Sequence, residues 1–349
     1  MKKNRIKDLS RAELEAALKE ALGEHYRVSQ IFRWLYKASV RSFGEMTDIP
    51  APLRLALDSK TYISMPELLD LKRSLSDGTT KYLFKLEDGS TIETVLLPER
   101  SRNTVCLSSQ VGCKFACDFC ASAPFGFVRN LSQAEILDEV VFIKNANPGA
   151  NITNLVFMGI GEPLDNYDNV MRAVRIFNDK DAFKIGARKI TISTCGVVPG
   201  IEKLAKEGLQ VELSVSLHSA DDSVRSRILP VNKRYALKNL MAACKNYIRA
   251  TNRIITFEYV LIDGVNSSGP DALALAKLLK AMKCKVNVIS YNRISGSPYR
   301  EPKEFAVRAF MKVLKDAGLN ATHRKPKGEE IDAGCGQLRI SRFEKEGAE

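Results

Sequence analysis

Strand-like and helix-like segments alternate along most of this 349-residue chain, and the alternation limits the folds that it can adopt. Six short apolar segments have the length and composition of buried strands. They cover residues 105–108, 152–158, 189–193, 211–217, 256–262 and 285–291. Helix-like segments lie between or after them, from residue 132 onward and at 168–177, 201–206, 237–249, 271–282 and 302–317. Six such repeats predict a parallel sheet with helices outside, either a doubly wound sheet or an open partial barrel.

Three cysteines follow the first of these strands. Cys113, Cys117 and Cys120 have C-x3-C-x2-C spacing and lie where both architectures gather reactive residues, at the carboxyl end of a strand. Three thiolates can hold a 4Fe–4S cluster and leave one iron free for a small molecule. A closed zinc site usually takes four ligands, often from two C-x2-4-C pairs, and the sequence has no second pair. The spacing favours a cluster with an open iron, and a zinc site is the alternative.

The first hundred residues have a different pattern. Ser10 and Glu13 form a capping-box pair before a helical repeat of leucines, and helical spacing recurs at residues 28–39 and around 53–57. Alternating apolar residues on both sides of Asp88-Gly89 predict a β-hairpin. We therefore expect a helical domain at 1–75, a hairpin linker at 76–100, a core at 101–324 and a polar, mobile tail at 325–349.

The net charge of +12 has two interpretations, a solvated basic surface or a phosphate-rich partner such as nucleic acid. Basic residues concentrate near both ends of the chain, at Lys2, Lys3, Arg5, Lys7, Arg324, Lys325 and Lys327. The sequence has neither an apolar membrane span nor a secretory signal. Eight cysteines without such a signal favour metal or redox chemistry over disulfides, and we expect a cytoplasmic protein.

A second motif supports the open-iron cluster. The run Met-Gly-Ile-Gly-Glu-Pro ends the second predicted strand, and its glycines allow a ligand to approach the backbone, while Glu162 can accept hydrogen bonds from an ammonium group. Together with the three cysteines, this run resembles the radical S-adenosylmethionine (SAM) enzymes. That resemblance implies a partial (β/α)6 barrel, SAM bound at the free iron, and Gly161 and Glu162 beside the methionine amine. Reductive cleavage of SAM would then give a 5'-deoxyadenosyl radical.

Further motifs narrow the resemblance. Cys106 lies seven residues before Cys113, and Cys335 lies in Ile-Asp-Ala-Gly-Cys-Gly-Gln-Leu near the C-terminus. With Ile-Ser-Thr-Cys-Gly-Val-Val-Pro, Ser-Leu-His and Tyr-Asn, the whole chain resembles the RlmN/Cfr family of rRNA adenine methyltransferases. The resemblance implies that Cys335 carries the methyl group and that Cys106 deprotonates the RNA adduct and then bonds Cys335. Glu93 matches the family's proton acceptor, although a glutamate on a hairpin strand is usually solvated.

The resemblance also implies the remaining partners of the reaction. Two SAM molecules would be consumed per methylation, and 23S rRNA, with tRNA beside the anticodon, would be the substrate. An electron donor such as flavodoxin would reduce the cluster, and a thiol reductant would reduce the disulfide. The enzyme would be a monomer. Cys195, Cys244 and Cys284 match no role and are interpreted as structural thiols. The expected SAM contacts, at the ends of later strands, are Ser193, Ser216, Leu217, His218 and Asn292.

Three alternatives remain open. Pro163 and the run Gly-Phe-Val-Arg-Asn-Leu at residues 126–131 resemble the branch that methylates adenine C2, and the other branch methylates C8 and confers antibiotic resistance. A zinc-stabilised RNA-binding protein without activity is a hypothesis of a different class. A radical SAM enzyme acting on a small molecule is the third, and the basic charge and the pair formed by Cys106 and Cys335 count against it.

Overall fold

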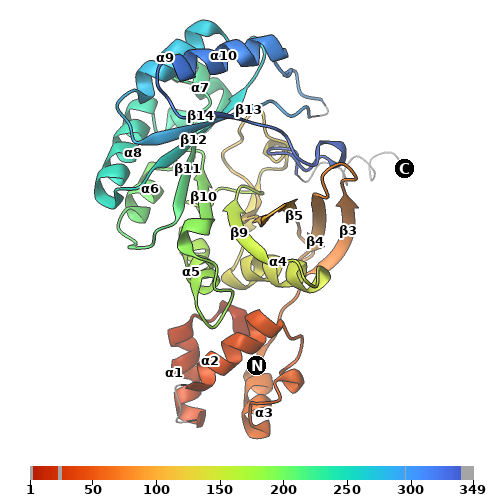
Figure 1. Cartoon of the computed structure of the whole chain (residues 1–349). Helices are drawn as coiled ribbons and strands as arrows, with labels where there is room; N and C mark the ends of the chain where they lie inside the picture. Colours follow the sequence, from red (N-terminus) through yellow and green to blue (C-terminus); the bar gives the residue numbers. More distant parts are fainter. Residues whose placement is uncertain (1–2, 23–25, 295, 339–349) are drawn as a thin grey trace.

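Ten strands form one continuous sheet in the order β14-β13-β12-β11-β10-β9-β6-β5-β4-β3 in a computed structural model that describes residues 3–22, 26–294 and 296–338 (Figure 1). Seven strands are parallel and follow one another in the order of the sequence. They are β6 (Arg102–Cys106), β9 (Ile152–Phe157), β10 (Ile190–Thr194), β11 (Glu212–Ser216), β12 (Ile255–Leu261), β13 (Cys284–Ser290) and β14 (Ala321–Arg324). All six predicted strands are confirmed. The strand order never reverses among them, as it would in a doubly wound sheet, so the partial barrel is the correct alternative.

Helices cover the outer side of the curved sheet (Figure 1). Six of them correspond to the predicted helices: α4 (Gln133–Ala146), α5 (Tyr167–Asn178), α6 (Val198–Leu204), α8 (Leu237–Thr251), α9 (Gly269–Leu279) and α10 (Glu304–Asp316). The short, polar helix α7 (Asp222–Ile228) was not predicted. In β12, Phe257 and Tyr259 are fully buried on the helix-covered side, and each such side chain contributes about 1.5–3 kcal/mol of stability. Glu258 and Val260 alternate with them and face the barrel interior.

Three antiparallel strands extend the sheet beyond β6. They are β3 (Glu67–Arg73), β4 (Thr80–Lys85) and β5 (Thr91–Glu99), and we call them the extension. The predicted hairpin corresponds to β4 and β5. Strand β3 was not predicted because its leucines, at 68, 69 and 71, do not alternate regularly with polar residues. In the structure Leu68 and Leu71 are exposed. It lies within the segment that the sequence assigned to the helical domain.

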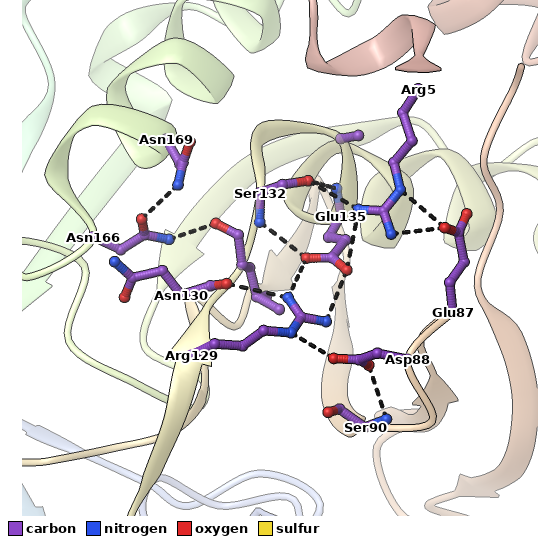
Figure 2. Close-up of polar contacts among 12 residues, drawn as sticks. Arg5, Glu87, Asp88, Ser90, Arg129, Asn130, Ser132, Glu135, Asn166 and Asn169 are labelled. Atoms are coloured by element: carbon purple, nitrogen blue, oxygen red, sulfur yellow. Dashed lines mark hydrogen bonds and ion pairs between the residues drawn. The ribbon is translucent and has the colours of Figure 1, made fainter. Parts of the chain in front are cut away.

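The N-terminal helices are α1 (Arg11–Leu22), α2 (Tyr26–Phe32) and α3 (Ala51–Lys60), and the predicted reciprocal bonds between Ser10 and Glu13 are present. Strand β1 (Asn4–Arg5) pairs with β2 (Thr61–Tyr62). The fully buried Lys7 binds Asp138 of α4 and donates to the carbonyl oxygen of Ser64 over 2.8 Å. Arg5 pairs with Glu87 and with Glu135 (Figure 2). Arg5 and Lys7 are therefore paired with carboxylates of the protein itself, and their contacts are structural.

The C-terminal segment packs on the extension as far as the structure describes it. Ala333 and Leu338 are buried in a small cluster with Val95 and Cys106. The prediction of a mobile tail is wrong for residues 325–338, because the sequence shows few apolar residues there and does not show the surface that receives them. Residues 339–349 lie outside the described part of the chain. Among the described residues, no helix has both the length and the apolar character needed to cross a bilayer.

Candidate active site

Two cavities adjoin each other at the carboxyl ends of the barrel strands. The inner cavity has a volume of about 160 Å³ and lies inside the barrel, whereas the outer cavity has a volume of about 50 Å³ and lies between β5, β14 and the C-terminal segment. Cys335, Met158 and Ile289 line both. Cys335 is exposed, so its side chain is accessible where the two cavities meet.

Cys113, Cys117 and Cys120 form one wall of the inner cavity. They follow the short strand β7 (Gln110–Gly112), which pairs with β8 (Phe127–Asn130). All three are free thiols, and burial raises the pKa of each, that of Cys113 to about 12. The negative charges of neighbouring groups raise the pKa values of Cys113 and Cys117 further. Bound iron would offset both effects, because it stabilises thiolates directly.

The donor set fits an iron–sulfur cluster. In the described residues, no three His, Cys, Asp or Glu side chains converge on the position of a single metal ion. A 4Fe–4S cluster does not need such convergence, since each thiolate binds a different iron. Three free thiols on one wall of a cavity satisfy that requirement.

Gly161 and Glu162 lie on the inner cavity beside this wall. Gly161 has φ +100°, and a Cβ atom there would lie 2.5 Å from the Cβ atom of Gln110. The buried Glu162 carboxylate accepts hydrogen bonds from the backbone N–H groups of Leu164 at 2.9 Å and Cys195 at 2.7 Å. Burial raises its pKa, and these bonds lower it. Each oxygen keeps a second lone pair, so Glu162 can still accept from an ammonium group in the cavity.

Ser193, Ser216 and His218 also line the inner cavity, from the ends of β10 and β11. Nδ1 of His218 accepts from the backbone N–H of Val260 over 3.0 Å, and burial lowers the pKa of the imidazole to about 3. His218 is therefore neutral, with its proton on Nε2. The Leu217 side chain is buried and does not line the inner cavity.

Arg225 of α7 holds these strand ends together. Its buried guanidinium donates to the carbonyl oxygens of Cys195, Ser216 and Leu217 at 2.8, 3.0 and 3.1 Å. No sequence pattern marks this role, because α7 is short and polar and has few apolar residues to mark a helix. A single arginine in a polar segment is usually exposed, so the sequence does not predict that Arg225 is buried.

Asn292 lies apart from the other expected SAM contacts. It lines the outer cavity, and its Nδ2 atom donates to the carbonyl oxygen of Cys335 over 3.3 Å. A Cβ atom at Gly334 would lie 2.6 Å from that Nδ2 atom, so the glycine allows this contact. Asn292 therefore holds the backbone of the Cys335 loop.

Cys106 and Cys335 face the same outer cavity. Burial raises the pKa of the Cys106 thiol, and the proximity of Cys335 adds to this effect. Arg324, at the end of β14, lines the cavity with them, and its positive charge lowers both pKa values. The structure thus brings together two cysteines that lie 229 positions apart in the sequence.

Glu93 is not among the described residues that line either cavity. It is only 2% exposed, and its Oε1 atom lies 3.4 Å from Nζ of the equally buried Lys81. The expectation of a solvated hairpin glutamate is wrong. The carboxylate belongs to a buried ion pair.

Two further residues, Cys195 and Glu258, line the inner cavity although the sequence did not identify them as site residues. Cys195 lines it, whereas Cys244 and Cys284 do not. Glu258 is buried on the cavity wall, and its Oε2 atom has no hydrogen-bond partner in the described chain. The alternation within the predicted strand 256–262 placed Glu258 on the face opposite Phe257 and Tyr259, and this was the available signal.

The barrel, its three-cysteine loop and the adjoining Gly161-Glu162 turn define a radical SAM enzyme. Residues 107–276 match the model of the radical SAM superfamily, and residues 5–63 match that of the ribosomal RNA large subunit methyltransferase N-terminal domain. A radical SAM methyltransferase from Sphaerobacter thermophilus has a similar structure, with a TM-score of 0.92 and 42% identity over 96% of this chain and 99% of that one.

Curated relatives agree over nearly the full length. The dual-specificity RNA methyltransferase RlmN of Pelobacter propionicus is 42% identical over 97% of this chain and 96% of its own. A protein of a Thermoanaerobacter species, named as a probable RlmN, is 44% identical over 96% of this chain and 97% of its own. This chain belongs to the RlmN family of radical SAM RNA methyltransferases.

Proposed function

We propose that this enzyme methylates C2 of an adenine in 23S rRNA and C2 of the tRNA adenosine beside the anticodon, with Cys335 as the methyl carrier. The observation that carries the proposal is the position of Cys335 between the two cavities. A methyl group received in the inner cavity can be presented to RNA in the outer one without dissociating from the protein. The names of the relatives, which describe dual-specificity RNA methyltransferases, support both RNA substrates.

The inner cavity would bind SAM. Cys113, Cys117 and Cys120 would hold a 4Fe–4S cluster, which supplies the electron that cleaves SAM to methionine and a 5'-deoxyadenosyl radical. Glu162 would accept from the methionine ammonium group, and Ser193, Ser216 and neutral His218 would contact the ribose and adenine. The Leu217 backbone, fixed by Arg225, would keep Ser216 and His218 in place.

Cys335 and Cys106 would carry out the transfer. The Cys335 thiolate first takes a methyl group from one SAM. The radical made from a second SAM removes a hydrogen atom from this S-methyl group, and the resulting carbon radical adds to C2. Cys106 takes the C2 proton and bonds the Cys335 sulfur, the bond between that sulfur and the transferred carbon breaks, and this carbon takes up a proton, which releases methylated RNA. Disulfide formation yields two electrons: one completes the two-electron reduction of SAM to methionine and 5'-deoxyadenosine, and the other would return to the cluster that supplied the first. A thiol reductant restores both cysteines.

Several parts of the proposal rest on family resemblance. We propose a monomeric, cytoplasmic enzyme that receives electrons from a protein such as flavodoxin. We keep the division into residues 1–75, 76–100, 101–324 and 325–349, with the N-terminal unit as the RNA-binding domain. Its model match to a ribosomal RNA methyltransferase domain supports this role.

Nucleoside mass spectrometry of rRNA and tRNA treated with the reconstituted enzyme tests the function. We expect 2-methyladenosine in both RNAs, and none with the Cys335→Ala variant, which also lacks S-methylcysteine. 8-Methyladenosine would instead identify the enzyme with the C8 branch. A protein that binds RNA but has no iron after anaerobic reconstitution, and modifies neither RNA, would contradict the proposal.

A further inference from the structure

Polar contacts at the far end of the extension hold the segment that leads to Cys335. Lys327 pairs with Glu99 at 2.8 Å, and the backbone N–H of Gly328 donates to Asp77 over 3.0 Å. One carboxylate oxygen of Glu330 accepts from the Ser74 hydroxyl at 2.5 Å and from the backbone N–H of Ser76 at 3.1 Å. The segment is therefore attached to the extension at successive points before the loop turns toward the cavities.

One more polar contact lies closer to Cys335 and is partly buried. Nζ of Lys81, on β4, donates to the carbonyl oxygen of Asp332 over 3.1 Å, three residues before Cys335. Asp332 has φ +50°, a left-handed conformation that a non-glycine residue adopts only when its surroundings hold it. Lys81 is 3% exposed, and the nearby carboxylate of Glu93 on β5 offsets the cost of burying the lysine charge.

The extension is itself fixed to the barrel at its opposite end. Arg129 pairs with Asp88 in the β4–β5 turn and with Glu135 at the start of α4, while Arg5 joins Glu87 to the same Glu135 (Figure 2). Because one end is attached to α4 and the other to residues 327–332, the extension can transmit the position of the barrel to the Cys335 loop. Among the polar contacts between the extension and residues 327–332, that of Lys81 is the nearest to Cys335 in the sequence.

We propose that Lys81 and Glu93 are positioning residues that fix the Cys335 loop between the two cavities, and that Glu93 acts through Lys81 rather than by accepting a proton from the RNA adduct. The importance of this position for catalysis rests on the proposed function of Cys335. The proposal that Lys81 and Glu93 hold the loop is independent of that function, because it concerns only the contacts of the loop.

Hydrogen exchange tests how the loop is held, without reference to RNA. In the reconstituted holoenzyme we expect roughly tenfold faster amide exchange in a peptide covering residues 328–338 for Lys81→Met and for Glu93→Gln, because each removes a charge-assisted contact. The matched controls are Lys85→Met and Glu67→Gln, which break an exposed ion pair of 3.3 Å between β4 and β3 of the same extension. Glu330→Ala is a milder second variant, since it removes surface contacts alone and leaves the buried pair intact.

RNA methylation then separates positioning from proton transfer. We expect similar losses for Lys81→Met, Glu93→Gln and the double variant, partial rescue by Lys81→Arg, and an unchanged pH profile of the residual activity. Unchanged exchange in Lys81→Met, Glu93→Gln and Glu330→Ala would overturn the proposal, as would a pH profile altered by Glu93→Gln alone. Faster exchange in an enzyme whose wild type forms no methyladenosine would refute the proposed function and leave the positioning role standing.

Discussion

The side-chain amide of Asn292 donates a hydrogen bond of 3.3 Å to the carbonyl oxygen of Cys335. This contact connects the end of β13, the last predicted barrel strand, to the loop of the proposed methyl carrier. Asn292 thus acts on the backbone of Cys335 from the barrel side, while Lys81 acts on Asp332 from the extension. The reactive thiol lies between two independent points of attachment.

Replacing Asn292 with alanine is expected to lower RNA methylation about fivefold, the value of one neutral hydrogen bond of roughly 1 kcal/mol. The affinity for SAM should stay near that of the wild type, because Asn292 lines the outer cavity. Steady-state methylation and equilibrium binding measure the two effects. Asn239→Ala, an exposed change on α8, is the control. A loss confined to SAM binding would show that Asn292 contacts the cofactor instead.

The Cys106→Ala variant is expected to accumulate a covalent protein–RNA adduct. Without this thiol, the adduct on Cys335 can neither lose its proton to Cys106 nor be released by disulfide formation. Denaturing electrophoresis of protein from expressing cells, with and without ribonuclease, detects the adduct. Cys284→Ala changes a thiol outside both cavities and should give free protein. Free protein from both variants would count against the assigned role.

Gly161→Ala is expected to reduce SAM binding by at least about tenfold. The new Cβ atom would overlap Gln110, and alanine at φ +100° is strained by on the order of 1–3 kcal/mol, so the Gly161-Glu162 turn must shift. Equilibrium binding of SAM to the reconstituted protein measures the loss. Gly186→Ala is the matched control, because its Cβ atom would meet nothing within 4 Å. Equal affinities would show that the turn tolerates the change.

Arg225→Met should lower the free energy of unfolding by about 3–5 kcal/mol, as for other buried charged groups whose partners are left unsatisfied. Three backbone carbonyl oxygens lose their donor, and all three lie at the ends of β10 and β11. Urea denaturation measures the change. Arg227→Met, an exposed position on the same helix, should change stability by less than about 0.5 kcal/mol. Similar small effects in both variants would contradict the role of Arg225.

His218 should make the protein less stable in acid. Its pKa is about 3 in the folded chain and about 6.5 when unfolded, so the unfolded state binds the extra proton between these values. The free energy of unfolding therefore falls as pH drops from about 6.5 toward 3. Thermal melting at pH 6.5 and 4.5 should show a smaller decrease in His218→Gln than in the wild type. Identical decreases would indicate that His218 is protonated in the folded protein.

Local sequence determined much of the barrel. The six apolar segments became parallel strands in the predicted order, because a continuous apolar segment between helices is stable only when both faces of the sheet are covered. The capping pairs at Ser10 and Ser132 marked helix starts, because their hydrogen bonds join residues three apart. Capping signals of this kind involve residues within one helical turn, so they can be read from the sequence without knowledge of the tertiary structure.

Only the tertiary structure decided what the isolated polar residues do. Glu93 on its strand looked solvated, and it proved to be the buried partner of Lys81. The sequence alone did not mark Arg225 as buried, and it left open whether Arg5 and Lys7 contact solvent or a phosphate-rich partner, whereas the structure pairs them with carboxylates. The sequence determined which segments form the barrel, and its motifs and family resemblance predicted which cysteines carry the chemistry. It did not determine which side chains are buried or that Cys106 and Cys335 face one cavity, because both depend on surfaces that exist only once distant segments have packed together.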